Sequence, residues 1–197
     1  MVKGTYVALG ILAAIALIAV GVVGAGIAAY NSLNRSSIAV DAQGKDVDVI
    51  YQRNFQLLPQ LDSIATRYFA NETAVQEQVA ALRSGITAAQ NGSLTVKTNL
   101  TEQLNGLVAV LGSRAESYPQ LKGDQLFITL QDETTNSANK LAAEKLRYND
   151  LAQAYNTERN TCCFPILVAH MTGFAPKEYI GYNDRPNQES FPAGQGL

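Results

Sequence analysis

The chain has 197 residues, with 15 basic and 17 acidic side chains and a formal net charge of −2. This near balance provides no broad positive surface, so we expect no nucleic acid among its partners. Two adjacent cysteines, Cys162 and Cys163, and a single histidine, His170, are too few for a zinc cluster. We expect no metal and no cofactor, and we expect these three side chains to serve packing.

The first predicted element is a membrane helix. No charged residue occurs from Gly4 to Asn34, and the centre of this stretch reads TYVALGILAAIALIAVGVVGAGIAAY. About 20 apolar residues cross a bilayer as a helix, whereas the apolar part of a cleaved signal peptide has only about 7–15. The length therefore favours a retained anchor over residues 1–34, followed by a helical domain over 35–183.

The anchor is rich in small side chains, several of them four residues apart. In lipid, helices associate through close backbone approach over such residues, because apolar burial does not drive them together. We therefore predict a homo-oligomer with its anchors in contact. The predicted packing residues of the membrane helix are Gly10, Ala14, Gly21, Gly24, Ala25 and Ala28.

Beyond the anchor, apolar residues recur at steps of three and four, the heptad-like pattern of helices that pack as in a coiled coil. Gln43 and Asn54 occupy the same seam, where Asn54 would need a hydrogen-bond partner. Pro59 lies off this stripe and is expected to bend the helix. The stripe consists of Val40, Val47, Ile50, Leu57, Leu61, Ile64 and Tyr68.

Three further helices follow in the sequence. Asn71 is predicted to cap the next helix, and the turn residues QNGS at 90–93 separate that helix from another. A final long helix is expected over residues 124–159, and the Pro- and Gly-rich segment 184–197 is expected to form a polar tail. The three stripes are Val75, Val79, Leu82 and Ile86; Leu100, Leu104, Leu107, Leu111 and Tyr118; and Phe127, Leu130, Leu141, Tyr148, Leu151 and Tyr155. This pattern predicts an all-α fold, with an N-terminal transmembrane helix followed by an antiparallel bundle of long helices.

The segment RYNDLAQAYN contains Tyr-Asn twice, one heptad apart. Because Tyr148 and Tyr155 share the helix face of Phe127, we expect them to pack in the bundle, as we do Leu57 and Leu61. The chain has no nucleophile elbow, phosphate-binding loop or metalloprotease signature. We therefore expect no catalytic residues and no enzymatic activity.

Four triplets have the pattern of N-glycosylation acceptors, at Asn34, Asn71, Asn91 and Asn99. They slightly favour an extracytoplasmic location for the bundle. The charges that flank the anchor do not decide its orientation.

Five segments in order resemble the LemA family: YNSLNRSS, YQRNFQLLPQL, SYPQLKGDQLFITLQDE, RYNDLAQAYN and FPILVAHMTGF. The resemblance spans about residues 28–180. It implies a single-pass membrane protein with an antiparallel α-helical bundle, no enzymatic activity and no cofactor. The chain differs from the family where Asn54 and Gln56 replace charged residues.

These observations favour a non-enzymatic, membrane-anchored bundle that contacts membrane lipid and self-assembles as a structural or scaffold protein. One alternative is a membrane adaptor whose tail recruits a signalling or proteolytic protein partner. Another is a pilin-like filament subunit with a leader cut after Gly4, although the acidic residue usual in such subunits is absent. An enzyme would require Tyr148, Asn149, Arg53 and the acids near Glu133 to converge.

Overall fold

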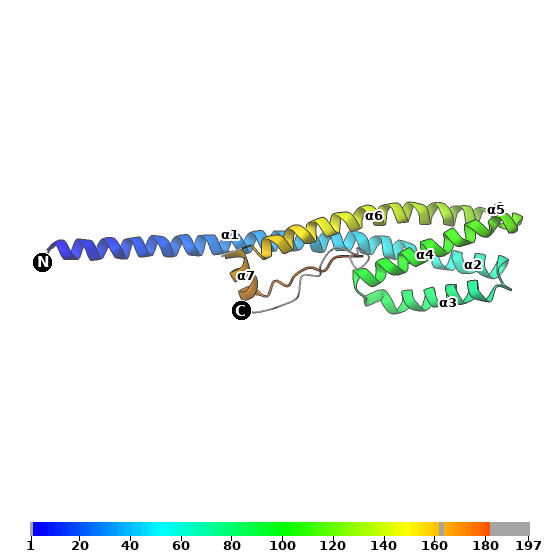
Figure 1. The fold of residues 1–197 in the computed structure, drawn as a ribbon, viewed down its shortest axis with the longest axis horizontal. Coiled ribbons are helices and arrows are strands. Elements are labelled where there is room, and N and C mark those ends of the chain that lie inside the picture. Colours follow the sequence, from blue (N-terminus) through cyan, green and yellow to red (C-terminus); the bar gives the residue numbers. More distant parts are fainter. Residues whose placement is uncertain (1, 162–163, 182–197) are drawn as a thin grey trace, which may run out of the picture. The chain divides into compact units, whose positions relative to one another are not determined.

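The computed structural model describes residues 2–161 and 164–181, with side chains from residue 9 onward (Figure 1). Cys162, Cys163 and the predicted tail at 184–197 lie outside this range. Seven α-helices occur in the described part, which contains no strand, so the predicted all-α fold is confirmed. Their bounds are α1 Val2–Phe55, α2 Leu58–Tyr68, α3 Thr73–Ala88, α4 Leu94–Arg114, α5 Pro119–Lys122, α6 Gln125–Arg159 and α7 Phe164–Thr172.

Helix α1 joins the predicted anchor and the first bundle helix into one uninterrupted element of 54 residues. By length and composition it can cross a membrane, and its most apolar stretch is not buried against the protein. From Leu33 onward the pattern changes, because Leu33, Val40 and Val47 are almost fully buried. The same helix is therefore apolar all round in its first half and one-sided in its second.

The chain divides into two compact units. Unit 1 contains α1 up to Gln43 together with Tyr148–Glu178. Unit 2 contains Gly44–Arg147 and the segment that begins at Tyr179. Both α1 and α6 contribute one part to each unit.

The core of unit 2 is formed by the end of α1, the helices α2, α3 and α4, and the start of α6. All of the apolar residues predicted for the stripe of α3 are buried, as are the four leucines predicted for the stripe of α4. Leu57, Leu61 and Phe127 lie buried in this core. Antiparallel helices bury one face each here, as the periodicity predicted.

Two local predictions in unit 2 are wrong. Pro59 does not bend one long helix: α1 ends at Phe55, and α2 begins at Leu58 after a two-residue turn. Proline has no backbone N–H to donate and is best tolerated in the first turn of a helix, where Pro59 lies. Asn71 does not cap α3 either. Glu72 takes the N-cap position without a side-chain hydrogen bond to the helix.

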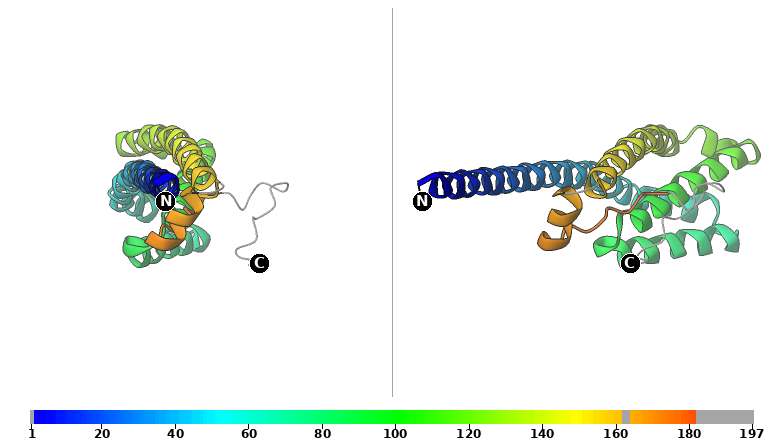
Figure 2. Two further views of the ribbon diagram at one scale, coloured as in Figure 1. Left: turned by 90° about the vertical axis from the view of Figure 1, so that its left-hand side faces the viewer. Right: turned by 60° about the vertical axis from the view of Figure 1, so that its left-hand side comes forward.

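Unit 1 contains an element that the sequence did not predict, the nine-residue helix α7, which lies beside α1 (Figure 2). Here α6 buries Tyr148, Ala152 and Tyr155. Tyr148 is 8% exposed and Tyr155 is fully buried. Gly173 ends α7 with a φ of 76°, a left-handed conformation that glycine adopts without strain.

Candidate membrane and assembly surface

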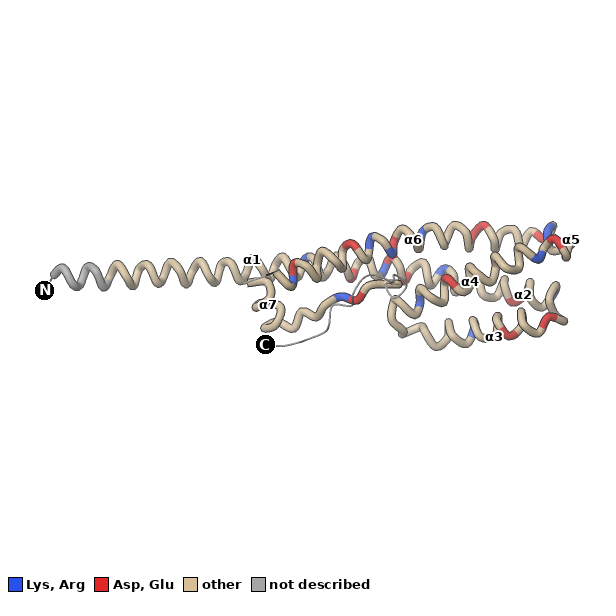
Figure 3. Tube along the Cα trace, viewed as in Figure 1, with Lys and Arg blue, Asp and Glu red and all other residues tan. Residues whose placement is uncertain are grey.

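The first half of α1 presents apolar side chains outward. Leu17 and Val20 are 74% and 71% exposed, and between residue 9 and Arg35 the helix carries no charge (Figure 3). Such a surface is costly in water and suited to lipid. Gly10, Gly21 and Gly24 each have open space where a side chain would begin, with no atom within 4 Å of an added Cβ.

Six small residues in the apolar half of α1 lie on one side of the helix. At about 100° per residue, Gly10, Ala14, Gly21, Gly24, Ala25 and Ala28 cluster on one face, which we call the small-residue face. None of the three fully open glycines contacts another part of unit 1. This face is therefore free to approach another helix closely.

The opposite side of α1 forms a groove with α7. Val22, Val23, Gly26, Ile27 and Tyr30 line one wall. The other wall consists of Phe164, Leu167, Val168, Met171 and Thr172, and the groove has a volume of about 370 Å³. By the helical period, its wall on α1 is about half a turn away from the small-residue face. The two faces therefore do not compete for the same contacts.

Helix α7 is held in unit 1 by the segment that follows it. The Tyr155 hydroxyl donates to the carbonyl oxygen of Ala175 at 2.9 Å, and Arg159 Nε donates to the carbonyl oxygen of Phe174 at 2.8 Å. The ring of Phe174 packs against Tyr30, with centroids 5.7 Å apart. Burial is the main cause that raises the pKa of Tyr155, so its hydroxyl stays a donor.

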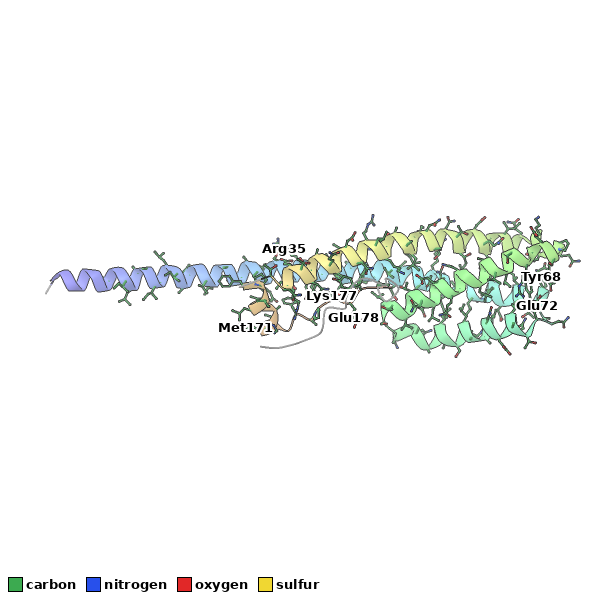
Figure 4. All side chains as sticks on the ribbon, in the orientation of Figure 1. Arg35, Tyr68, Glu72, Met171, Lys177 and Glu178 are labelled. Carbon is green, nitrogen blue, oxygen red and sulfur yellow. The ribbon has the colours of Figure 1, made fainter. Side chains whose placement is uncertain are left out.

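Charged groups of α1 and α6 complete this arrangement. Lys177 Nζ lies 2.7 Å from Asp41 Oδ1, close to the start of the second half of α1 (Figure 4). The Ser36 hydroxyl donates to Glu158 Oε2 at 2.6 Å, and Ser32 also donates to this carboxylate. Helix α6 is thereby fixed to α1 within one or two turns of the apolar stretch.

In unit 2, two carboxylates near the α2–α3 connection accept hydrogen bonds from tyrosine hydroxyl groups. Tyr68 donates to Asp124 Oδ2 at 2.7 Å, and this bond is the main cause that lowers the pKa of the Asp124 carboxyl. Tyr118 donates to Glu72 Oε1 at 2.6 Å, a bond that raises the pKa of Tyr118. Figure 4 shows Tyr68 and Glu72 on either side of this connection. Asp124 also accepts from the backbone N–H of Leu126 at 2.8 Å and so caps α6.

Sequence reasoning missed a buried cation in the core of unit 2. Lys97 is 8% exposed. Its Nζ lies 2.6 Å from Asp48 Oδ1 and 5.3 Å from the centre of the Tyr51 ring. Tyr51 in turn donates to the carbonyl oxygen of Ile86 at 2.9 Å. The only signal in the sequence was Lys97 one turn before the leucine stripe of α4.

Of the four polar groups considered for a reaction centre, Arg53 and Glu133 belong to unit 2, and Tyr148 and Asn149 belong to unit 1. Arg53 lies 3.8 Å from Glu133 in unit 2, and both side chains are partly exposed. Tyr148 is buried in unit 1, and burial is the main cause of its raised pKa. Among the described residues, no group of three or more His, Cys, Asp or Glu side chains could hold a metal ion.

The acceptor asparagines differ in accessibility. Asn71, Asn91 and Asn99 are exposed, whereas Asn34 is half-buried. The three exposed side chains lie in unit 2.

These features define a class, an all-helical protein whose N-terminal helix is compatible with a single-pass membrane anchor. The model of the LemA family matches residues 43–192, and the chain belongs to this family. No curated protein matches the chain. Membership agrees with a membrane-associated helical protein, and the match begins within α1, beyond its apolar half.

Proposed function

We propose that this protein is a non-enzymatic, membrane-anchored helical bundle that self-assembles through α1 and serves as a structural or scaffold protein. The observation that carries the proposal is the open small-residue face of α1, half a turn from the groove. Gly21 and Gly24 have no neighbour within 4 Å of an added Cβ. A second copy of α1 can therefore approach this face without displacing α7.

The physical basis is helix association in lipid. Lipid tails are as apolar as leucine, so association depends on close van der Waals packing, and small residues four apart permit it. Gly21 with Ala25, and Gly24 with Ala28, have this spacing.

The continuity of α1 would link the membrane contact to the bundle. The helix continues without interruption to Phe55, and its second half carries Val40, Val47 and Tyr51 into buried packing. Anchors in contact would therefore hold the first bundle helices of neighbouring copies close together. A scaffold needs this kind of mechanical connection rather than a reaction centre.

We further propose that the bundle faces the extracytoplasmic side, which the exposed Asn71, Asn91 and Asn99 favour. The test is a single thiol at the exposed Val110 in a chain carrying Cys162→Ser and Cys163→Ser. A membrane-impermeant thiol reagent should label Val110→Cys in intact cells as fully as in broken cells. Labelling only after breakage would place the bundle in the cytoplasm.

The assembly test compares two double variants of the full chain in nanodiscs or mild detergent. Gly21→Ile with Gly24→Ile blocks the small-residue face, whereas Ala16→Ile with Ala19→Ile adds bulk at the same spacing on the far side of α1. The first variant should lower the oligomeric mass and the second should preserve it. A native protein that is monomeric in lipid would overturn self-assembly, and equal masses for all three proteins would remove the small-residue face from it.

A further inference from the structure

We infer that the groove between α1 and α7 binds the acyl chain of a membrane phospholipid, and that α7 lies in the interfacial layer of the bilayer. The inference rests on the proposed role of α1 as a membrane anchor. It adds a second membrane-contacting element and a lipid site to that role.

The position of the groove along α1 is the first argument. Its α1 wall ends at Tyr30, five residues before Arg35, the first charged residue after the apolar stretch. At about 1.5 Å per residue, Tyr30 lies roughly 8 Å along the helix from Arg35. If Arg35 marks the headgroup layer, the Tyr30 end of the groove lies in the outer part of the hydrocarbon, at the depth where tyrosine is enriched. The Val22 end lies roughly 20 Å from Arg35 and so reaches deeper into the acyl chains.

The lining is the second argument. Apart from the Tyr30 and Thr172 hydroxyls, the side chains that line the groove contain no hydrogen-bonding group. Its α1 wall belongs to the same uncharged stretch that would cross the bilayer, so the groove is continuous with the lipid-facing surface. A water-soluble partner would have no route to this wall, whereas an acyl chain would already surround it.

The exposure of the apolar side chains of α7 is the third argument. Met171 and Leu167, which line the groove, are 78% and 55% exposed, and Ile166, outside the groove, is 38% exposed. A nine-residue helix with three large apolar side chains exposed in this way is poorly solvated by water. In the interfacial layer these side chains would enter the acyl boundary, as in other amphipathic helices that lie along a membrane.

The attachment of α7 suits this position. Arg159 and Tyr155 bind the carbonyl groups of Phe174 and Ala175 from α6, and Lys177 pairs with Asp41. These contacts lie beyond the C-terminal end of α7. The Lys177–Asp41 pair is past Arg35 along α1, whereas the Phe174 ring packs at Tyr30, in the uncharged stretch. The segment thus places its charges on the water side and α7 against the apolar stretch.

A fluorescence experiment tests the depth of α7, because the chain has no tryptophan. Met171→Trp reports on α7, Val20→Trp on the apolar stretch of α1, and Val110→Trp on the exposed surface of unit 2. Each full-length variant is reconstituted into vesicles of phosphatidylcholine brominated on its acyl chains. Bromine close to the headgroup should quench Met171→Trp most, and bromine deeper in the chain should quench Val20→Trp most. Val110→Trp should not be quenched.

A second measurement tests the groove itself. Gly26 lines the groove, and a Cβ added there meets no atom within 4 Å, so Gly26→Leu extends a side chain into the groove. Native mass spectrometry of protein purified in mild detergent should show fewer retained phospholipids for Gly26→Leu than for the native chain. Ala16→Leu, outside the groove, should retain the native number.

The outcomes separate the two proposals. If Val20→Trp is not quenched, α1 is not in the bilayer, and the anchor fails together with the groove. If Val20→Trp is quenched while Met171→Trp behaves like Val110→Trp, the anchor stands and the interfacial position of α7 is wrong. Equal lipid retention by Gly26→Leu and the native chain would overturn the acyl-chain site. That result is also the one expected if a second copy of the chain, and not a lipid, occupies the groove.

Discussion

The side chain of Asn156 forms two hydrogen bonds with the backbone of Lys177. Asn156 Nδ2 donates to the carbonyl oxygen at 2.8 Å, and Oδ1 accepts from the N–H at 2.9 Å. One carboxamide thereby satisfies both polar groups of a residue that lies outside any helix. Together with the hydrogen bond from Tyr155 to Ala175, these two bonds attach the segment after α7 to α6. This attachment is the structural role of the Tyr155-Asn156 dipeptide.

Replacement of Asn156 by alanine should release this segment. Both backbone groups of Lys177 would lose their partner, and each unsatisfied group costs about 1–3 kcal/mol when it stays buried. Because Lys177 is only half-buried, water should compensate part of the loss. We expect faster amide hydrogen exchange across residues 174–178 in Asn156→Ala, with little change in unit 2.

Gln153→Ala is the matched control, since Gln153 lies on the exposed side of the same helix. Its exchange rates at 174–178 should equal those of the native chain. If Asn156→Ala also left those rates unchanged, the two hydrogen bonds would not hold the segment, and α7 would be positioned by its apolar contacts alone.

The apolar periodicity predicted most of the helices because each buries one face, and a buried face repeats in the sequence. Leu61 and Leu104 follow that period, and both are fully buried. Helix α7 escaped prediction because its nine residues are too short for a period. Its position depends on single hydrogen bonds from Tyr155, Asn156 and Arg159 to residues 15–21 positions away.

The polar parts of unit 2 show the same limit. From the sequence, a lysine beside a leucine stripe is predicted to lie on the surface. The burial of Lys97 is explained by Asp48 and the Tyr51 ring, which lie close to its ammonium group. The small-residue face of α1 and the apolar face opposite it could be predicted from the sequence by the helical period. The groove could not, because its second wall is α7.

Leu57 tests whether unit 2 unfolds as one cooperative core. The side chain is 4% exposed, in the turn between α1 and α2. Truncation of a buried leucine to alanine costs about 2–5 kcal/mol, since it combines lost transfer free energy with a cavity. Leu57→Ala in the full chain should therefore lower the free energy of unfolding in this range, as measured by denaturant titration in detergent.

Val49→Ala provides the comparison, because Val49 is 65% exposed on the same stretch of α1. Its effect should be small. Equal stabilities for Leu57→Ala and Val49→Ala would show that the turn between α1 and α2 is not part of the core.

The Tyr68–Asp124 hydrogen bond predicts a dependence of stability on pH. Because this bond lowers the pKa of Asp124 in the folded state, the carboxylate stabilises the fold above its unfolded pKa of about 3.9. That contribution is lost as the pH falls through the lower, folded pKa. The difference in melting temperature between the native chain and Asp124→Asn should therefore be constant near neutral pH and shrink in acid.

Tyr68→Phe separates the hydroxyl from the other partners of Asp124. It removes the largest cause of the lowered pKa while keeping the ring, and Arg67 remains 2.7 Å from the carboxylate. We expect its pH profile to lie between those of the native chain and Asp124→Asn. A profile identical to that of the native chain would assign the pH dependence to other groups.

The last prediction concerns Asn54, which lies in the seam of α1 and is 1% exposed. Its sequence position predicted a hydrogen-bond partner, but neither Nδ2 nor Oδ1 has one among the described residues. The buried hydroxyl groups of Thr98, Thr101 and Ser137 are also without partners in this part of the chain. The buried amide of Asn54 therefore gains no hydrogen bond from the described residues in exchange for those it makes to water in the unfolded chain.

Asn54→Leu keeps the number and branching of side-chain heavy atoms, with somewhat larger volume, and removes both polar atoms. Since an unsatisfied buried polar group costs about 1–3 kcal/mol, we expect this variant to raise the free energy of unfolding by an amount of that order. Asn54→Asp, which puts a charge in the same place, should instead lower it strongly. Denaturant titration of the full chain measures both. If Asn54→Leu destabilised the protein as much as Leu57→Ala does, the Asn54 amide would have to be hydrogen-bonded in solution. Asn54 would then be explained as a polar seam residue that specifies helix register, and not as an unsatisfied buried group.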